Sequence, residues 1–343
     1  MPWYKPLGVR RIPPGYDLRV KAILQRGYGG PEVLQLTEIE RPTVADGDVL
    51  VRVRAASANA LDWHYMRGEP RVMRMSSGLR KPKQESVGVD FAGTVETVGS
   101  NVKQFKPGDE VFGGRTGAFA DYVCVPEGKQ IVLKPANVTF EEAAAVPVAG
   151  ITALQALRDG GHVAAGQHVL INGAGGGVGT FAVQIAKSFG ARVTGVSNTS
   201  NMEMLSEIGA DEVIDYSTQD FTKSETRYDL MLDIAGNRSW SECRRVLHPK
   251  SGYVIVGGLS KKPWLGPLTH SAALSIASLG ASQHVVPLFF AKLAQGDLTV
   301  LQGLLESGKV KPVIDRTYSL SEAPEAIRYL EAGHARGKVV ITV

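Results

Sequence analysis

The stretch NGAGGGVGTFAVQIAK (172–187) decides the fold, because it joins the strand pattern HVLING (168–173) to a helix pattern. Glycines at Gly173, Gly176 and Gly179 of such a strand–turn–helix unit indicate a dinucleotide-binding turn. One glycine permits the tight turn, one lets the backbone approach a pyrophosphate, and Gly179 permits close contact between helix and strand. A tight turn that binds nothing is the alternative, but the strands on both sides favour the binding turn.

The helix after this turn predicts how the phosphates are held. The first amide N–H groups of a helix have no partner within it, so they face an anion placed at the N-terminus. The residues that we expect to contact the cofactor here are Gly173, Gly176, Gly177, Val178 and Gly179.

The end of the next strand, RVTGVS (192–197), predicts which dinucleotide binds. An acidic residue there would bond the ribose 2′-hydroxyl of NAD and repel a 2′-phosphate. The chain instead continues with hydroxyls and amides, so we expect Ser197, Asn198 and Asn201 to receive the 2′-phosphate of NADPH. A capped loop leading into a helix is the alternative for the same residues.

Two kinds of pattern divide the chain. Strand and helix patterns alternate around the glycine-rich turn, which predicts a doubly wound parallel sheet. The N-terminal part has short strand patterns separated by glycine and proline, which indicates a β-barrel-like unit. Strand patterns of the alternating part include YDLMLDIAG (228–236) and SGYVIVGG (251–258). Strand patterns of the N-terminal part include VLVRVRAAS (49–57) and VDFAGTVETVG (89–99).

Composition excludes several classes of protein. A length of 343 residues suggests two domains. The two cysteines, Cys124 and Cys243, are too few for a disulfide framework or a four-cysteine zinc site. No 18-residue apolar run or secretion signal is seen, so we expect no membrane partner and a cytoplasmic protein. Residues 1–19 hold four basic and one acidic side chain, so the remaining residues carry only +1 of the net charge of +4. This nearly neutral remainder gives no reason to expect binding to nucleic acid.

Motifs along nearly the whole chain resemble those of the medium-chain dehydrogenase/reductase family, in its zinc-free quinone oxidoreductase-like branch. Besides the glycine-rich turn they are GYGGPEVL (27–34), GVDFAGTVETVG (88–99), FKPGDEVFG (105–113), AAAVPVAGITALQAL (143–157) and GKVVITV (337–343). They run in the family's order from about residue 20 to the last residue. Only residues 1–19 lie outside the resemblance.

The resemblance implies an α/β fold in which a GroES-like β-barrel catalytic domain is interrupted by a Rossmann domain. Carried onto this chain, the catalytic domain comprises residues 20–141 and 285–343, and the NAD(P)-binding Rossmann domain residues 142–284. Residues 1–19 form an N-terminal extension. The cofactor is expected in the cleft between the two domains.

The resemblance also implies an enzyme without catalytic zinc. The three positions that hold the metal in zinc-dependent relatives carry Asn59, Val89 and about Ala145, none of which is a plausible zinc ligand. Hydride addition to a quinone or an α,β-unsaturated carbonyl gives a delocalised anion that hydrogen-bond donors can stabilise without a metal. We therefore expect an NADPH-dependent reductase of such small-molecule substrates.

Two residues are candidates for catalysis. Asn59 replaces the first metal ligand, so its amide is expected to face the cleft and donate to a substrate oxygen or hold the nicotinamide; a turn-capping Asn is the alternative. Tyr65 is a candidate donor or acid, with packing on the barrel as its alternative. This stretch has one residue more between Asp62 and Arg67 than many quinone reductases, which leaves the alignment beyond Asp62 open.

The family suggests further contacts with the cofactor. Thr152 is expected at the nicotinamide, or else bonded to its own helix backbone. Tyr216 is expected at the adenosine end, or else as a cap on the sheet edge. Lys338 is expected near the cofactor, or else at the surface. Gly257 and Gly258 end a strand at the edge of the sheet where ligands bind.

Ser200 departs from the family, because many close relatives carry Arg in its place. We therefore expect NADPH to be favoured and NADH to be possible. The loop 71–84 is either a substrate lid or a solvated basic loop, and residues 287–290 either line the cleft or belong to the core. Residues 274–286 are expected to pair as edge strands in a homodimer, or to form an internal strand.

Three functions remain open at this point. The first is the NADPH-dependent quinone or enone reductase. The second is an enoyl-thioester reductase, whose longer channel would need a basic rim. The third is a cofactor-binding protein with little catalysis.

Overall fold

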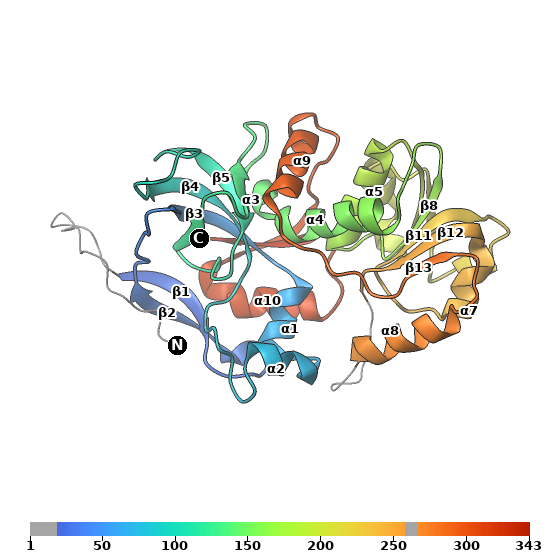
Figure 1. The fold of residues 1–343 in the computed structure, drawn as a ribbon, viewed down its shortest axis with the longest axis horizontal. Helices are drawn as coiled ribbons and strands as arrows, with labels where there is room; N and C mark the ends of the chain where they lie inside the picture. The colour runs from blue at the N-terminus through green and yellow to red at the C-terminus, as the bar shows by residue number, and fades with distance from the viewer. Residues whose placement is uncertain (1–18, 258–265) are drawn as a thin grey trace.

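The computed structural model describes residues 19–257 and 266–343. Figure 1 shows this part of the chain as two lobes, a strand-rich lobe that contains both the first and the last strands and a second lobe built around a parallel sheet. The N-terminal extension, apart from Arg19, lies outside the described residues.

The second lobe contains a six-stranded sheet formed by β8 (His168–Asn172), β9 (Arg192–Ser197), β10 (Glu212–Asp215), β11 (Tyr228–Asp233), β12 (Leu247–Ile255) and β13 (His284–Val286). Their order is β10-β9-β8-β11-β12-β13, and every neighbouring pair is parallel. The chain runs from β8 to one edge and then returns to β11 and the other edge. The predicted doubly wound sheet is confirmed, and in such sheets ligands generally bind at the point where the strand order reverses, here the carboxyl ends of β8 and β11.

The strand-rich lobe contains β1 (Arg19–Gln25), β2 (Leu34–Glu40), β3 (Asp48–Ala58), β4 (Asp90–Val98), β5 (Glu110–Gly114), β6 (Tyr122–Pro126), β7 (Ile131–Leu133), β14 (Ile314–Ser319) and β15 (Lys338–Thr342). β1 and β2 form a hairpin, and the others form a sheet of order β14-β15-β3-β4-β5-β7, with β6 on β3. β15 is antiparallel to β3, so the end of the chain returns to this lobe.

The helices are α1 (Ala60–Arg67), α2 (Arg74–Ser77), α3 (Phe140–Ala144), α4 (Pro147–Gln155), α5 (Gly177–Ser188), α6 (Met202–Glu207), α7 (Trp240–Cys243), α8 (Gly266–Ala277), α9 (Gln295–Glu306) and α10 (Ala323–Glu331). The expectation of edge strands over 274–286 is largely wrong, because α8 continues to Ala277 and only β13 is extended. Within the described residues, no helix combines the length and apolar character needed to cross a membrane.

One apolar cluster joins the two lobes. It includes Phe112 of β5, Leu154 of α4, Phe181 of α5 and Leu232 of β11, all fully buried. Because α4 packs on both the barrel strands and α5, the junction between the lobes is a packed core rather than a linker. The boundaries at 141/142 and 284/285 stay predictions; β13 itself spans the second of them.

Candidate functional site

The glycine-rich turn has the geometry that its sequence predicts. Gly173 has φ of 90°, a left-handed conformation that favours glycine. A Cβ on Gly179 would lie 2.2 Å from the Gly173 carbonyl oxygen, so only glycine lets α5 approach the turn this closely. A Cβ on Gly176 would meet nothing nearer than 3.7 Å. No protein atom crowds the backbone at Gly176, the N-cap of the twelve-residue α5, and the amide groups of such a helix N-terminus favour an anion.

The loop after β9 gathers the residues expected at the 2′-phosphate. The Asn201 side-chain amide donates to Ser197 Oγ at 2.9 Å, and Ser200 Oγ donates to Asn198 Oδ1 at 2.9 Å. Tyr216, half exposed, follows β10 and is held beside this loop by its backbone N–H, which donates to the Ser197 carbonyl at 3.0 Å. The structure thus brings together Ser197, Asn198, Asn201 and Tyr216.

A carboxylate also lies here, which analysis of β9 alone missed. Asp215, the last residue of β10, accepts hydrogen bonds from the Thr199 hydroxyl and from the Ser217 hydroxyl and backbone N–H. These donors lower the pKa of Asp215, so its negative charge persists well below neutral pH. The sequence did contain a sign of this carboxylate, because the neighbouring strand β10 ends in an aspartate.

Arg336 is the second residue that sequence reasoning missed. Its Nε donates to Asn201 Oδ1 at 3.0 Å, and its backbone N–H donates to Asp315 at 2.9 Å. The guanidinium group is exposed and lies beside the loop after β9. In this loop Ser200 replaces the Arg of many relatives, so Arg336 supplies a positive charge that the loop itself lacks. Because Arg336 comes from the returning C-terminal segment, 135 residues after Asn201, local sequence patterns around β9 gave no signal for it.

The same C-terminal segment crosses the glycine-rich turn. The Gly337 N–H donates to the Gly175 carbonyl at 2.9 Å, and Gly337 forms an isolated parallel bridge with Gly176. A Cβ on Gly177 would lie 3.1 Å from Lys338 Cδ. The strand-rich lobe therefore closes one side of the turn through main-chain contacts.

Lys338 points away from solvent into a polar cluster between β3, β4 and α1. It is only 2% exposed, and its Nζ donates to Asn59 Oδ1 at 2.6 Å and to the Ala58 carbonyl at 3.3 Å. Asp90 Oδ2 lies 3.6 Å from the same Nζ. The expectation of a surface lysine is therefore wrong; the cofactor contact stays a prediction.

Asn59 stands at the centre of this cluster. It caps α1, its Nδ2 donates to Asp90 at 2.8 Å and to the Ser57 carbonyl at 3.3 Å, and its backbone N–H donates to Asp62 at 2.8 Å. Both amide hydrogens are thus engaged inside the protein, and the residue is 6% exposed. The direct contact with a substrate oxygen stays a prediction; the geometry places Asn59 as the link between Asp90 and Lys338.

Burial dominates the protonation of this cluster. It raises the pKa of Asp62 to about 7 and also raises the pKa of Asp90, because desolvation penalises a carboxylate. It lowers the pKa of Lys338, although the attraction of Asp90 and Asp62 opposes this. Burial therefore works against the charged form of each of these three groups.

The remaining candidates lie in different settings. Tyr65 is 47% exposed on α1, and its hydroxyl has no partner in residues 19–257 and 266–343. Thr152 Oγ1 donates to the Val148 carbonyl at 2.6 Å, its own helix backbone, as the alternative predicted. Gly257 follows β12, where a Cβ would lie 2.3 Å from the Ile234 carbonyl oxygen. Gly258 lies outside the described residues.

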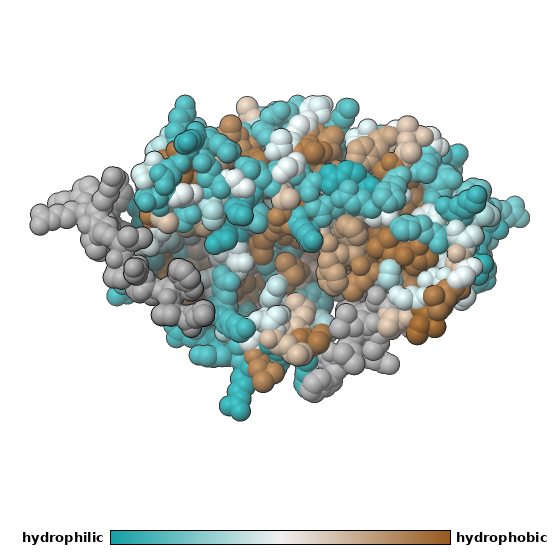
Figure 2. Space-filling view, viewed as in Figure 1, coloured by the Kyte–Doolittle hydropathy of each residue, from teal (hydrophilic) through white to brown (hydrophobic). Residues whose placement is uncertain are grey.

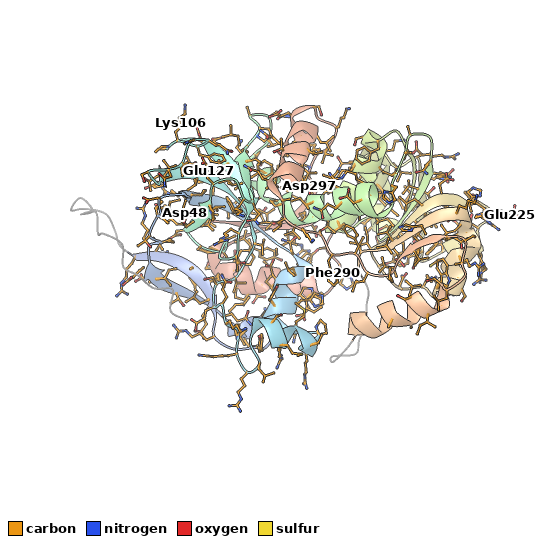
Figure 3. The ribbon with its side chains drawn as sticks, in the orientation of Figure 1. Asp48, Lys106, Glu127, Glu225, Phe290 and Asp297 are labelled. Atoms are coloured by element: carbon orange, nitrogen blue, oxygen red, sulfur yellow. The ribbon has the colours of Figure 1, made fainter. Side chains whose placement is uncertain are left out.

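The segment 287–290 divides between core and surface. Phe289 packs on the main apolar cluster, whereas Phe290 is 73% exposed. Figure 3 shows Phe290 between the two lobes. The segment is fixed by Gln155, which exchanges two hydrogen bonds with the Lys292 backbone. Phe290 is thus a rigidly mounted apolar side chain at the junction of the lobes.

The positions that hold zinc in zinc-dependent relatives, and both cysteines, carry side chains unsuited to a metal. Val89 and Ala145 are buried aliphatic residues. Burial raises the pKa values of both Cys124 and Cys243 to about 12, so both thiols stay protonated at neutral pH. Across residues 19–257 and 266–343, no group of three or more His, Cys, Asp and Glu side chains could hold a metal ion.

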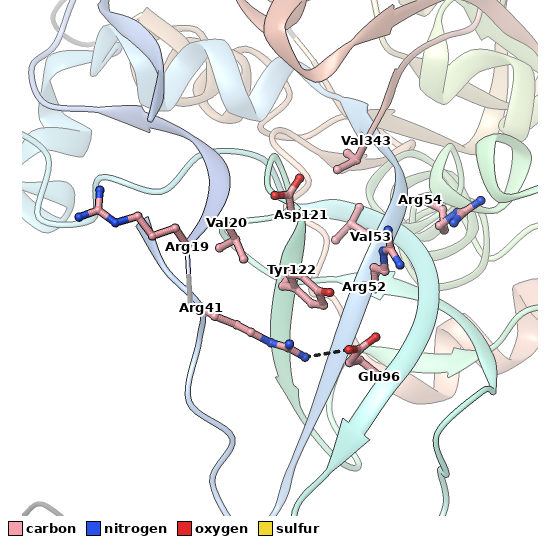
Figure 4. Close-up of a pocket in the computed structure, with 10 residues that line it drawn as sticks. All are labelled: Arg19, Val20, Arg41, Arg52, Val53, Arg54, Glu96, Asp121, Tyr122 and Val343. Atoms are coloured by element: carbon pink, nitrogen blue, oxygen red, sulfur yellow. Dashed lines mark hydrogen bonds and ion pairs between the residues drawn. The ribbon is translucent and has the colours of Figure 1, made fainter. Parts of the chain in front are cut away.

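A separate pocket of about 320 Å³ opens on the barrel (Figure 4). Its two acids are already engaged: Glu96 pairs with Arg41 at 3.0 Å, and Asp121 accepts from the Lys21 backbone N–H at 2.6 Å. None of the predicted site residues lines it. Its walls are Arg19, Val20, Arg41, Arg52, Val53, Arg54, Glu96, Asp121, Tyr122 and Val343.

Comparisons with known proteins agree across most of the chain. The profile described as "Alcohol dehydrogenase GroES-like domain" matches residues 45–136, and the one described as "Zinc-binding dehydrogenase" matches residues 208–341. The mitochondrial NAD(P)H oxidoreductase RTN4IP1 of Mus musculus is 34% identical, over 92% of this chain and 87% of that protein. The 2-methylene-furan-3-one reductase of Solanum lycopersicum is 33% identical, over 94% of this chain and 79% of that protein.

A solved structure shows the same likeness in three dimensions. The quinone oxidoreductase from Coxiella burnetii superposes with a TM-score of 0.82 at 30% identity. The match covers 95% of this chain and 99% of that one.

Proposed function

Because the chain belongs to the quinone oxidoreductase-like branch of the medium-chain dehydrogenase/reductase family, we propose that it reduces quinones or α,β-unsaturated carbonyl compounds with NADPH and without zinc. At the coarser level, it is an oxidoreductase that uses a nicotinamide cofactor. The observation that carries the finer proposal is the position of Arg336. Its guanidinium is a cation that contacts Asn201 in the predicted 2′-phosphate loop.

The residues present fit a dinucleotide laid across the carboxyl edge of the sheet. The N-terminus of α5 and the open space at Gly176 would hold the pyrophosphate. Ser197, Asn198, Asn201 and Arg336 would hold the 2′-phosphate, since hydroxyl, amide and guanidinium groups all donate to phosphate oxygens. Tyr216 would pack at the adenosine end. A bound reduced nicotinamide supplies a hydride; the protein supplies position and a site screened from water.

The negative charge of Asp215 would repel the 2′-phosphate of NADPH. We therefore expect only a limited preference for NADPH over NADH. The Asp215 carboxylate already accepts three hydrogen bonds from Thr199 and Ser217, so it does not need a ribose hydroxyl. Arg336 and Asp215 thus set the balance between NADPH and NADH, and we expect NADPH to be favoured and NADH to be used.

On the substrate side, the described residues offer the exposed ring of Phe290 and the half-exposed hydroxyl of Tyr65. Phe290 at the junction of the lobes suits a planar apolar acceptor. The Tyr65 O–H can deliver the proton that follows hydride addition and recover it from water, because it is half exposed. Asn59, Asp90 and Lys338 position α1, and with it Tyr65, relative to the glycine-rich turn.

Turnover with a panel of acceptors tests the proposal. NADPH oxidation is followed with 1,4-benzoquinones, 2-alkenals, enoyl thioesters and simple aldehydes in parallel. We expect turnover with the first two groups. Absence of turnover with every conjugated acceptor refutes the proposal, and turnover restricted to enoyl thioesters favours the second of the three open functions.

We also propose a homodimer. β13 is an edge strand with β12 as its partner in the described sheet, and Ile276 and Leu279 beside it are 70% and 78% exposed. Pairing of β13 with its copy would satisfy the open edge and cover these apolar side chains. Sedimentation equilibrium tests this, and a monomer at micromolar concentration refutes it. The cytoplasmic location stays a prediction that cell fractionation can check.

A further inference from the structure

The loop at residues 78–83 presents apolar and basic side chains together. Leu79 is 74% exposed, and Met75 just before the loop is 78% exposed. Arg80, Lys81 and Lys83 are exposed and form no ion pair with any residue of the described ranges. No acidic residue occurs between residues 70 and 84. The first one after the loop, Glu85, is already paired with Arg26 at 4.0 Å.

The base of this loop is held by hydrogen bonds, and its tip leaves Leu79 exposed. The Lys83 N–H donates to the Ser77 carbonyl at 2.7 Å, closing the loop. The Tyr28 hydroxyl donates to the Gly78 carbonyl at 2.7 Å. Arg74 stacks over the Tyr28 ring at 4.4 Å and donates to the Arg67 carbonyl of α1. The loop is therefore a braced projection, visible below α2 in Figure 1.

We propose that the loop 78–83 docks the protein on bilayer surfaces that carry anionic lipid headgroups. Arg80, Lys81 and Lys83 face the headgroup phosphates, each basic residue contributing about five-fold to partitioning at a charged surface. Leu79 and Met75 enter the interface, where apolar side chains lose contact with water. The contact is peripheral, so it needs no membrane-spanning helix. The expectation of no membrane partner considered only such a span.

Other partners fit these side chains less well. The loop carries no aromatic residue on which a nucleic acid base could stack. An acidic peptide would need a groove, whereas Figure 2 shows hydrophilic side chains projecting from the lower edge of the molecule beside hydrophobic atoms. A flat, negatively charged and partly apolar surface matches this shape.

Docking would also place the catalytic lobe near apolar acceptors dissolved in the bilayer, a consequence that rests on the proposed function. The loop is braced on the C-terminal end of α1, and Asn59 caps the other end of this eight-residue helix. At 1.5 Å per residue, this helix is about 12 Å long.

Vesicle flotation with the full-length protein tests the docking without cofactor or substrate. Vesicles of phosphatidylcholine alone are compared with vesicles that also contain phosphatidylglycerol. We expect binding to the second kind only, weakened by salt. The triple variant Arg80→Gln/Lys81→Gln/Lys83→Gln should bind roughly 100-fold more weakly. Leu79→Ser, which keeps the charges, should bind several-fold more weakly.

A matched control removes the same charge elsewhere. Lys103, Lys106 and Lys129 are exposed on the barrel and form no ion pair with described residues, and Figure 3 shows Lys106 at the edge opposite the loop. The variant Lys103→Gln/Lys106→Gln/Lys129→Gln should bind like the unchanged protein. Residues 1–19 are present in every protein tested, so their basic side chains cancel in the comparison.

Four results would overturn the proposal. They are no binding of the unchanged protein to phosphatidylglycerol vesicles, equal binding by the loop variant, equal weakening by the control variant, and loop-dependent binding to single-stranded RNA in place of vesicles. Unchanged binding of Leu79→Ser would overturn the insertion of the apolar side chain. These experiments measure binding and not turnover. Each outcome can therefore be interpreted even if the proposed reductase activity is absent.

Discussion

Replacement of Arg336 by Gln should separate the affinities for NADPH and NADH. In the structure its guanidinium lies exposed beside Asn201, at the loop predicted to receive the 2′-phosphate. A hydrogen bond to a charged partner contributes about 1.5–3 kcal/mol, and exposure favours the lower end of this range. Since 1.4 kcal/mol corresponds to a factor of ten, the Kd for NADPH should rise roughly 10- to 30-fold.

Calorimetric titration of the two cofactors measures this effect without turnover. The Kd for NADH, which lacks the 2′-phosphate, should change less than about two-fold, because the bond from Arg336 to Asn201 lies within the protein and NADH offers the guanidinium no phosphate partner. Added salt should shrink the difference between the two proteins for NADPH. Arg336→Lys, which keeps the charge but loses the fork geometry, should fall between them.

Arg244→Gln provides the matched control. Arg244 is exposed on the short turn Arg244–Val246 and forms no ion pair with described residues, so both affinities should stay unchanged. Equal weakening of NADPH and NADH by Arg336→Gln would refute the reasoning, because Arg336 would then act by holding the crossing of Gly337 over the glycine-rich turn. No change in either affinity would refute it as well.

Three further perturbations test other parts of the site. Gly176→Ala should leave the melting temperature unchanged, because its Cβ has 3.7 Å of clearance, but raise the Kd for NADPH at least about tenfold; an unaltered Kd would place the pyrophosphate elsewhere. Asn59→Ala should lower the free energy of unfolding by about 1–3 kcal/mol in urea titration, because buried Asp90 and Lys338 lose a partner, and a neutral result would contradict the cluster. Asp62 has a native pKa of about 7 and an unfolded value near 3.9, so the native state binds the extra proton and stability should fall as pH rises from about 4 to 7. Asp62→Asn should flatten this slope, and an identical slope in both proteins would assign the titration to another group.

Much of the parallel lobe could be predicted from its residues because its determinants are local. Gly173 is required by its own positive φ and Gly179 by the carbonyl of Gly173, six residues earlier, and each strand of the six-stranded sheet shows its apolar character in its own segment. Residues 274–286 show the limit of this approach. An apolar stretch with serine and alanine suits both a strand and a helix, and α8 takes the helical alternative as far as Ala277.

The sequence by itself determined the glycine-rich turn, the doubly wound sheet and the family, since short-range spacing and motif order carry that information. Only the tertiary structure decided what Asn59, Lys338 and Arg336 contact. Lys338 follows Asn59 by 279 residues, and Arg336 follows Asn201 by 135. Their meeting depends on β15 pairing with β3, which carries residues 336–338 across the glycine-rich turn. The periodicity of a segment reports which face is buried, but not which distant side chain lies against it.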